Sequence, residues 1–219
     1  MNTAKKILTH FMLVLVPCIV MAQGMDMSEY QKMAEGLSKN YPKELEPLMP
    51  KGYTVKGKNI AFAQTQSMFL VVGMQGTRKN EAYPKFGHET ELKVMVLAAN
   101  PATAGFMGAQ FPMMVQMMQQ GYMQAETDSN GDYVYDPMTV QSAGGVNVYV
   151  RKLVRKNVEI ENRKHQDQVY YNAQAVALVN NMMWQFEVLY YSGTPEALLA
   201  MIADNIRFVQ ATDFSKYMK

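Results

Sequence analysis

The sequence predicts an α+β fold, in which a single, mostly antiparallel sheet carries N-terminal, central and C-terminal helices packed on its faces. Several segments alternate apolar and other residues with a period of two, as half-buried strands do. Asn-Asn and Asn-Gly pairs between such segments favour tight hairpin turns. Three further segments place apolar residues at helical spacing, so the chain is expected to combine both kinds of element.

Residues 169–209 form the clearest folding unit. Trp184, Phe186 and Val188 alternate with the residues between them, and an alanine-rich run of the same period precedes them. Asn180 and Asn181 lie between the two runs, and asparagine tolerates the positive φ that a two-residue hairpin turn requires. The segment therefore predicts a β-hairpin.

A C-terminal helix is predicted directly after this hairpin. Thr194 can accept a backbone N–H as the N-cap, and Pro195 suits the first helical position, where no amide hydrogen is needed. The apolar residues that follow recur at helical spacing and give the helix one face to bury: Leu198, Leu199, Ile202 and Ile206.

The remaining elements follow from the same two periods. A helix is predicted over residues 26–41, and an interrupted helix over residues 102–120, because Gly105, Gly108 and Pro112 weaken its first half. This central segment is expected to be two short helices, or a loop and one helix. Asn130-Gly131 predicts a hairpin between strands at residues 122–126 and 133–135. Further strands are expected at residues 53–55, 60–65, 68–74, 91–99, 139–141, 146–154 and 158–160, the last continuing or pairing with the one before it.

The N-terminus predicts export. Lys5 and Lys6 precede an apolar run over residues 7–21, and Val20-Met21-Ala22 fits the small-x-small rule for cleavage after Ala22. Residues 1–22 are therefore expected to be a signal peptide and residues 23–219 a single domain in the periplasm or outside the cell. Two alternatives are lipidation at Cys18 and a retained anchor, although Pro17 and the short apolar run argue against them.

Composition narrows the function classes. Removing residues 1–22 takes away Lys5 and Lys6, so 19 of the 21 basic residues remain against 19 acidic ones and the mature chain is formally neutral. No charge-driven partner is implied, and no nucleic acid is expected. The only cysteine, Cys18, is also lost, and no Gly-x-Ser-x-Gly motif is present. We therefore expect a protein that is not an enzyme and has no cofactor.

A methionine-crowded segment is the most suggestive candidate site. Methionine is a flexible apolar filler that suits irregular cores or adaptable binding surfaces. The candidate surface for a partner protein or an apolar ligand consists of Phe106, Met107, Met113, Met114, Met117 and Met118. Packing in the core explains the same spacing. Four of these methionines also suggest an alternative, Cu(I) handling, since soft thioethers suit that ion.

The main basic concentration surrounds Arg151 and Arg155. Their spacing places them on one face of a predicted strand, where they could bind an anion. A charged, solvated edge that guards against aggregation explains them better.

The chain end resembles PsbP-like and DcrB-like proteins. The resemblance rests on Tyr190-Tyr191-Ser192-Gly193-Thr194-Pro195-Glu196-Ala197-Leu198-Leu199 and on Ile206-Arg207-Phe208, where a hydrophobic hairpin leads through a short polar loop into a final helix. The resemblance implies an antiparallel sheet sandwiched by helices and a non-catalytic, accessory role in an exported compartment. Together these observations predict an exported accessory protein of the bacterial cell envelope that binds a partner protein or an apolar ligand.

Overall fold

The computed structural model describes residues 41–63, 69–79, 89–99, 104–128, 133–135, 138–155, 158–160, 163–165, 170–191 and 193–218. The expected signal peptide lies outside these residues, as do positions 26–40 of the expected N-terminal helix. No membrane-spanning candidate, meaning a helix of sufficient length and hydropathy, occurs among the elements described.

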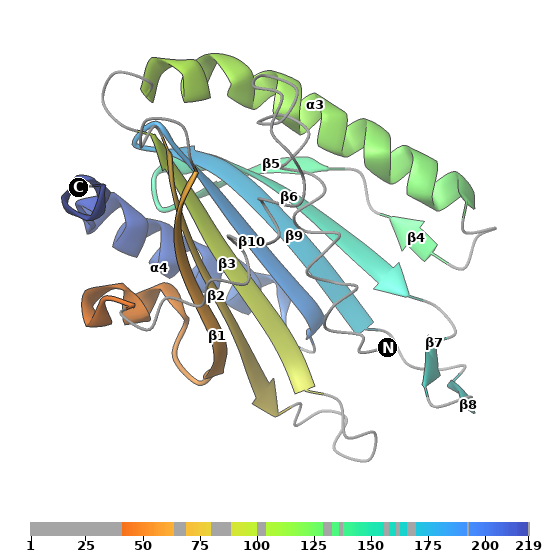
Figure 1. Ribbon diagram of the computed structural model, residues 1–219. Coiled ribbons are helices and arrows are strands. Elements are labelled where there is room, and N and C mark those ends of the chain that lie inside the picture. Colours follow the sequence, from red (N-terminus) through yellow and green to blue (C-terminus); the bar gives the residue numbers. More distant parts are fainter. Residues whose placement is uncertain are drawn as a thin grey trace.

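An antiparallel sheet makes up most of the described structure (Figure 1). Seven strands follow one another across it in the order β1-β2-β3-β10-β9-β6-β4, and β5 pairs with β6 as an eighth strand. The strands span Thr54–Ala63 (β1), Phe69–Lys79 (β2), Glu89–Ala99 (β3), Tyr133–Tyr135 (β4), Thr139–Ala143 (β5), Val146–Arg155 (β6), Tyr170–Val179 (β9) and Met182–Tyr191 (β10). A separate pair joins β7 (Val158–Ile160) to β8 (Arg163–His165).

The predicted hairpin of residues 169–209 is confirmed as β9 and β10 at the centre of the sheet. Asn180 and Asn181 have φ values of 49° and 59°, the positive values that a two-residue hairpin turn requires. On its other side β10 pairs with β3, with Trp184 opposite Val96 and Phe186 opposite Val94. These long-range pairings place a hairpin from the end of the chain between strands from its first half.

Alternate residues of the central strands belong to two separate apolar clusters. Val94, Val96, Trp184 and Phe186 pack in a large cluster that also contains the C-terminal helix. Met95, Leu97 and Met183 point to the other side, where they pack with residues of the central helix. Because side chains along a strand point alternately to its two faces, every second residue of β3 and β10 faces one cluster and the residues between them face the other.

The predicted C-terminal helix is confirmed as α4, Pro195–Ala211. The Thr194 side chain accepts a hydrogen bond from the backbone N–H of Ala197 at 3.2 Å, and Pro195 occupies the first turn. Leu198, Ile202 and Ile206 are buried, so the face predicted from spacing is the face that packs. Two short 3₁₀ helices, η1 (Lys43–Leu48) and η3 (Phe214–Tyr217), join the same cluster.

A buried amide connects α4 to the sheet and to η1. Asn205 accepts a hydrogen bond from Trp184 Nε1 at 2.7 Å and donates one to the backbone oxygen of Leu48 at 2.6 Å. Asn205 is only 3% exposed, so both bonds replace water that burial has removed. The three elements therefore share one satisfied polar contact inside an apolar cluster.

The turn between β5 and β6 explains the glycine pair in this part of the sequence. Gly144 has a φ of 60°, and a Cβ at this position would lie 2.7 Å from Cγ2 of Ile206. Gln210 Nε2 donates to the Gly144 oxygen at 3.0 Å. Only glycine allows both the backbone conformation and the close approach of α4.

The predicted fold class is wrong in its helices. Only two helices of seven or more residues are described, α4 and α3 (Ala104–Asp128), and the described structure is mostly a single sheet instead of a sheet covered by helices. The protein is better described as a sheet-rich α+β fold. Strand residues supply most of the larger apolar cluster, so the sheet, and not the helices, dominates the part of the chain that the structure describes.

Three local predictions are also wrong. Residues 102–120 are not two helices or a loop and a helix, because α3 is one helix of 25 residues that continues through residues 122–126, where a strand is predicted. The strand β4 pairs with β6 instead of forming a hairpin with residues 122–126. The segment at residues 158–160 pairs with β8 and not with β6.

Candidate partner surface on the helix α3

The helix α3 forms in spite of its own sequence. Gly105 and Gly108 each disfavour a helix interior by about 1 kcal/mol, and Pro112 by about 3 kcal/mol because it lacks an N–H to bond the oxygen of Gly108. Its inner face compensates, since a fully buried large apolar side chain contributes about 1.5–3 kcal/mol. That face consists of Met107, Phe111, Met114, Val115 and Met118, all no more than 9% exposed.

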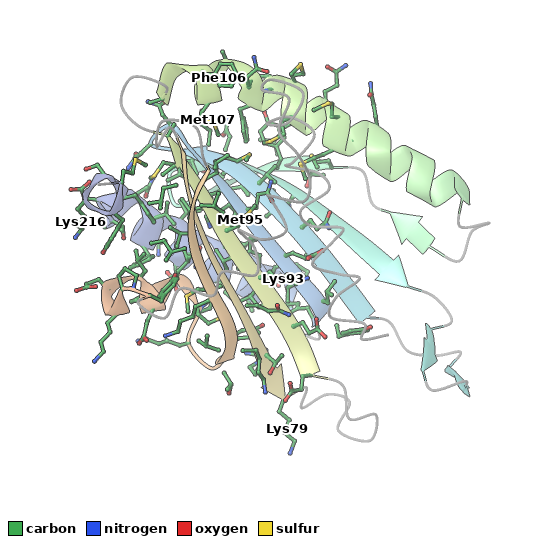
Figure 2. The ribbon with its side chains drawn as sticks, in the orientation of Figure 1. Lys79, Lys93, Met95, Phe106, Met107 and Lys216 are labelled. Carbon is green, nitrogen blue, oxygen red and sulfur yellow. The ribbon has the colours of Figure 1, made fainter. Side chains whose placement is uncertain are left out.

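The inner face packs on one side of the sheet. Its five residues cluster with Val71, Met95, Leu97, Val176 and Met183 from β2, β3, β9 and β10. The Phe111 and Tyr149 rings meet edge to face, with centroids 5.8 Å apart. Figure 2 shows Phe106 and Met107 near the N-terminal end of α3, with Met95 and then Lys93 further along β3. The helix is therefore fixed by tertiary contacts at one end of the strands.

A second set of apolar residues lies on the outside of the same helix. Phe106 is 48% exposed, Met113 50% and Met117 38%. They are seven and four residues apart, and steps of 100° per residue place all three within about 40° around the helix. We call these three residues the outer stripe. Single exposed apolar side chains are ordinary on a protein surface, whereas a row of large ones along one helix makes this side of α3 the candidate for a contact surface.

The six residues of the predicted surface are divided between these two faces. Met107, Met114 and Met118 are 8%, 5% and 7% exposed and belong to the core, as the alternative of core packing predicts. Phe106, Met113 and Met117 form the outer stripe. The four methionines proposed for Cu(I) therefore differ in environment, since Met114 and Met118 are buried in the core whereas Met113 and Met117 are 50% and 38% exposed.

The surroundings of the outer stripe carry no charge. No Asp, Glu, Lys or Arg occurs from Ala104 to Ala125, and the polar side chains at the other exposed positions are glutamines, Gln116, Gln119 and Gln120. Glutamine amides both donate and accept hydrogen bonds. The outside of α3 thus offers an apolar row with an uncharged polar rim, which is the composition of a protein interface with a polar border.

The predicted anion site can be followed only through its backbone. Arg151 and Arg155 lie on β6, opposite Gln174 of β9 and Tyr170 of β9 respectively. Their side chains lie outside what the structure describes. The strand β6 is paired with β9 on one side and with β4 and β5 on the other, so Arg151 and Arg155 are not on an edge strand in the described sheet.

A buried polar group that sequence reasoning does not identify lies below α3 on the sheet. Lys93 is 5% exposed and Glu187 8%, and Lys93 Nζ lies 3.6 Å from Glu187 Oε2. Gln174 Nε2 donates to Glu187 Oε1 at 2.9 Å. Backbone pairing extends this row from Gln75 of β2 to Arg151 of β6. The signal in the sequence is a charged residue on the same strand face as apolar ones: Lys93 with Met95 and Leu97 on β3, and Glu187 with Met183 and Leu189 on β10.

Burial controls the ionisation of this pair. It lowers the pKa of Lys93, because the charged ammonium loses its hydration, while the charges of Glu187 and Glu91 act in the opposite direction. An ion pair in such a setting contributes little to stability but is costly to break. Its arrangement is that of an internal structural contact between β3 and β10. No grouping of three or more His, Cys, Asp or Glu side chains that could hold a metal ion occurs within the described ranges.

Comparison with known proteins adds no relative. No protein-family model matches the chain, and no curated protein matches it.

Proposed function

We propose that this chain is an exported, non-enzymatic accessory protein of the bacterial cell envelope that binds a partner protein through the outer stripe of α3. The observation that carries the proposal is the exposure of Phe106, Met113 and Met117, at 48%, 50% and 38%, along one side of a helix that is firmly packed on its other side. Exposed apolar rows of this kind are interaction sites when the rest of the helix is fixed.

A protein surface suits the outer stripe better than a small apolar ligand. The outside of a helix is convex, whereas small ligands bind in concave sites that surround most of their surface. Methionine adds adaptability, because its unbranched side chain and polarisable sulfur fit partners of varied shape. The uncharged rim favours a partner surface that is likewise uncharged at its centre.

The proposed location is supported by the sequence. Lys5 and Lys6, the apolar run over residues 7–21 and the Val20-Met21-Ala22 motif have the order of a secretory signal peptide. N-terminal sequencing of the chain purified from the envelope of expressing cells tests this proposal. A mature N-terminus at Gln23 is expected, and an intact Met1 in the exported fraction would contradict it.

Site-specific photo-crosslinking tests the partner surface. A photoreactive phenylalanine analogue at Met113 is expected to give one discrete adduct in the envelope of cells that express the chain. The control carries the same analogue at Gln119, which is also exposed on α3 but lies about 120° around the helix from Met113. Adducts of equal yield at both positions, or none at Met113, would contradict the proposal.

A further inference from the structure

We propose that Met113 and Met117 are sites of selective, reversible oxidation, at which a peroxide converts each thioether to a sulfoxide and thereby turns the outer stripe from apolar to polar. The modification itself rests on the exposure and the surroundings of these two side chains. Its consequence, release of the partner protein, rests on the proposed role of the outer stripe as a partner surface and adds a mode of regulation to it.

Exposure separates Met113 and Met117 from the other methionines. They are 50% and 38% exposed, while their chain neighbours Met114 and Met118 are 5% and 7% exposed. Every other methionine whose side chain the structure describes is buried or partly buried. An oxidant must reach the sulfur, so the rate of oxidation follows exposure. The exposed fractions differ about tenfold within the first pair and about fivefold within the second, and the oxidation rates are expected to differ by similar factors.

The reaction needs only the thioether and the oxidant. With hydrogen peroxide, a sulfur lone pair attacks one oxygen, the O–O bond breaks, and the departing hydroxide takes the proton of the transferred oxygen to become water. Sulfur loses two electrons and peroxide gains them. A dithiol-dependent reductase reverses the change: the sulfoxide oxygen leaves as water and the dithiol becomes a disulfide. The only cysteine of the chain, Cys18, lies in the expected signal peptide, so no thiol of the mature chain would compete for the oxidant.

The surroundings of both side chains suit a sulfoxide. Gln116 follows Met113 by three residues and Gln120 follows Met117 by three, a spacing at which side chains are neighbours on a helix surface. Both glutamines are exposed, and their amide N–H groups can donate hydrogen bonds to a sulfoxide oxygen. Each oxidised side chain therefore has a donor of hydrogen bonds beside it on α3.

Oxidation at these two positions changes the surface and spares the fold. The packing of α3 on the sheet uses Met107, Met114 and Met118, and it does not use Met113 or Met117. Sulfoxides on the outer stripe therefore remove no core contact. A bound partner is affected differently, because a sulfoxide oxygen that a partner covers loses its water and is costly to bury without a donor. The oxidised outer stripe is thus expected to release the partner while the helix stays in place.

Site-resolved oxidation kinetics provide the first test. The chain is expressed from its full sequence, purified and treated with hydrogen peroxide, and tandem mass spectrometry follows the sulfoxide at each methionine of α3. Met113 is expected to oxidise about tenfold faster than Met114, and Met117 about fivefold faster than Met118. Each comparison joins adjacent residues of one peptide, so recovery and ionisation are matched. In urea above the unfolding transition, the four rates are expected to agree within about twofold.

Three results would overturn the modification site. They are equal rates within either pair of the folded chain, a difference in rate that persists in urea, and a loss of the helical circular dichroism signal when Met113 and Met117 are converted. The second result would mean that the selectivity does not come from the fold. The third would mean that the change is not confined to the surface.

Photo-crosslinking of the oxidised chain tests the release of the partner. A photoreactive phenylalanine analogue at Phe106 leaves both sulfurs in place. The purified chain is treated with peroxide, freed of it, mixed with the envelope fraction of cells that lack the chain, and illuminated, so that only this chain is oxidised. The adduct yield is expected to fall at least about fivefold and to recover after treatment with sulfoxide reductases for both sulfoxide epimers. A fall of less than about twofold, or no recovery, would overturn the inference.

The matched control removes the sulfurs and keeps apolar side chains. In Met113→Leu, Met117→Leu, peroxide is expected to change the adduct yield less than about twofold relative to the untreated yield of that same variant. A fivefold fall in this variant as well would overturn the inference, because the oxidised group would then lie elsewhere in the chain.

The two proposals fail in different ways. If the untreated chain gives no adduct at Phe106, the partner surface and its release by oxidation are both wrong, whereas selective sulfoxides at Met113 and Met117 would still establish the modification site. If an adduct forms and peroxide does not reduce its yield, the partner surface stands and its regulation by oxidation is wrong.

Discussion

The buried ion pair of Lys93 and Glu187 should reveal itself in a double-mutant cycle. Their side chains are 7% and 10% exposed, and their charged atoms lie 3.6 Å apart on β3 and β10. Glu187→Leu leaves an ammonium buried beside an apolar residue, and Lys93→Met leaves a carboxylate in the same position. Breaking a buried pair in this way typically destabilises a protein by about 3–5 kcal/mol.

The double variant Lys93→Met, Glu187→Leu should behave differently. It removes both charges and fills the volume with apolar groups beside Met95 and Met183, which already pack on that side of the sheet. Gln174 loses its acceptor, at a cost of about 1 kcal/mol, but it is only partly buried and can reach water. The free energy of unfolding of the double variant is therefore expected to lie within about 1–2 kcal/mol of the wild-type value. If the losses of the two single variants added, the decrease would instead be about 6–10 kcal/mol.

Urea unfolding at pH 7, monitored by circular dichroism, measures the free energy of unfolding of the wild type, the two single variants and the double variant. The exposed pair Lys58 and Glu46 provides the matched control, since it joins the same residue types at the surface. The double-mutant cycle of Lys58 and Glu46 should show no coupling free energy that is large enough to be measured from the urea unfolding midpoints. Losses that add in the Lys93 and Glu187 cycle would refute the reasoning, because additivity means that the two charges do not compensate each other.

Two further predictions concern buried polar groups. Asn205→Leu removes the partner of both Trp184 Nε1 and the Leu48 oxygen. Urea unfolding should therefore show that the free energy of unfolding falls by about 2–5 kcal/mol, against almost no change for the exposed control Asp204→Ala. A fall of less than about 1 kcal/mol would contradict the hydrogen bonds described. Burial raises the pKa of Tyr53 to about 12, although Arg78 opposes the shift, so the unfolded chain releases this proton at lower pH than the folded one and stability falls as the pH rises from about 10 to 12. From about pH 10 to pH 12, the free energy of unfolding of Tyr53→Phe should fall by about 2 kcal/mol less than that of the wild type, as measured by urea titrations at both pH values. An equal fall in the two proteins would show that Tyr53 is not the group responsible.

Local signals in the sequence were sufficient for the C-terminal unit. Asn180 and Asn181 specify the positive φ of a hairpin turn, and Thr194 with Pro195 specifies a helix start. Each signal acts within a few residues and agrees with the apolar pattern on either side. Agreement between turn chemistry and periodicity made this part of the fold predictable.

The central helix was not predictable in the same way. Gly105, Gly108 and Pro112 argue against a continuous helix, and the Asn130-Gly131 signal argues for a strand at residues 122–126. Five inner-face residues overrule these signals by packing on strands that are distant in the sequence. Propensity is a weak prior when a tertiary contact of that size competes with it.

The candidate site was predictable in part. The methionine spacing placed the candidate residues on a helix but did not separate its buried and exposed faces. Adjacent residues such as Met113 and Met114 differ only in whether they meet the sheet, which depends on tertiary packing. The pair of Lys93 and Glu187 depends on the pairing of β3 with β10, which are 94 residues apart at this point. Periodicity assigns each residue to a strand face, but it does not say which strand lies beside it.

The division of α3 into a buried and an exposed face separates the residues needed for folding from those of the proposed partner surface. The helix is poor in intrinsic propensity, so its stability must come from the inner face, and Met114 or Phe111 cannot be changed without loss of packing. Phe106, Met113 and Met117 contribute little to that packing, and substitutions at exposed positions are usually within about 0.5 kcal/mol of neutral. If folding were the only requirement, polar residues would serve as well at all three positions and would improve solubility. Large apolar side chains are present there instead, which is expected when a second protein surface covers them.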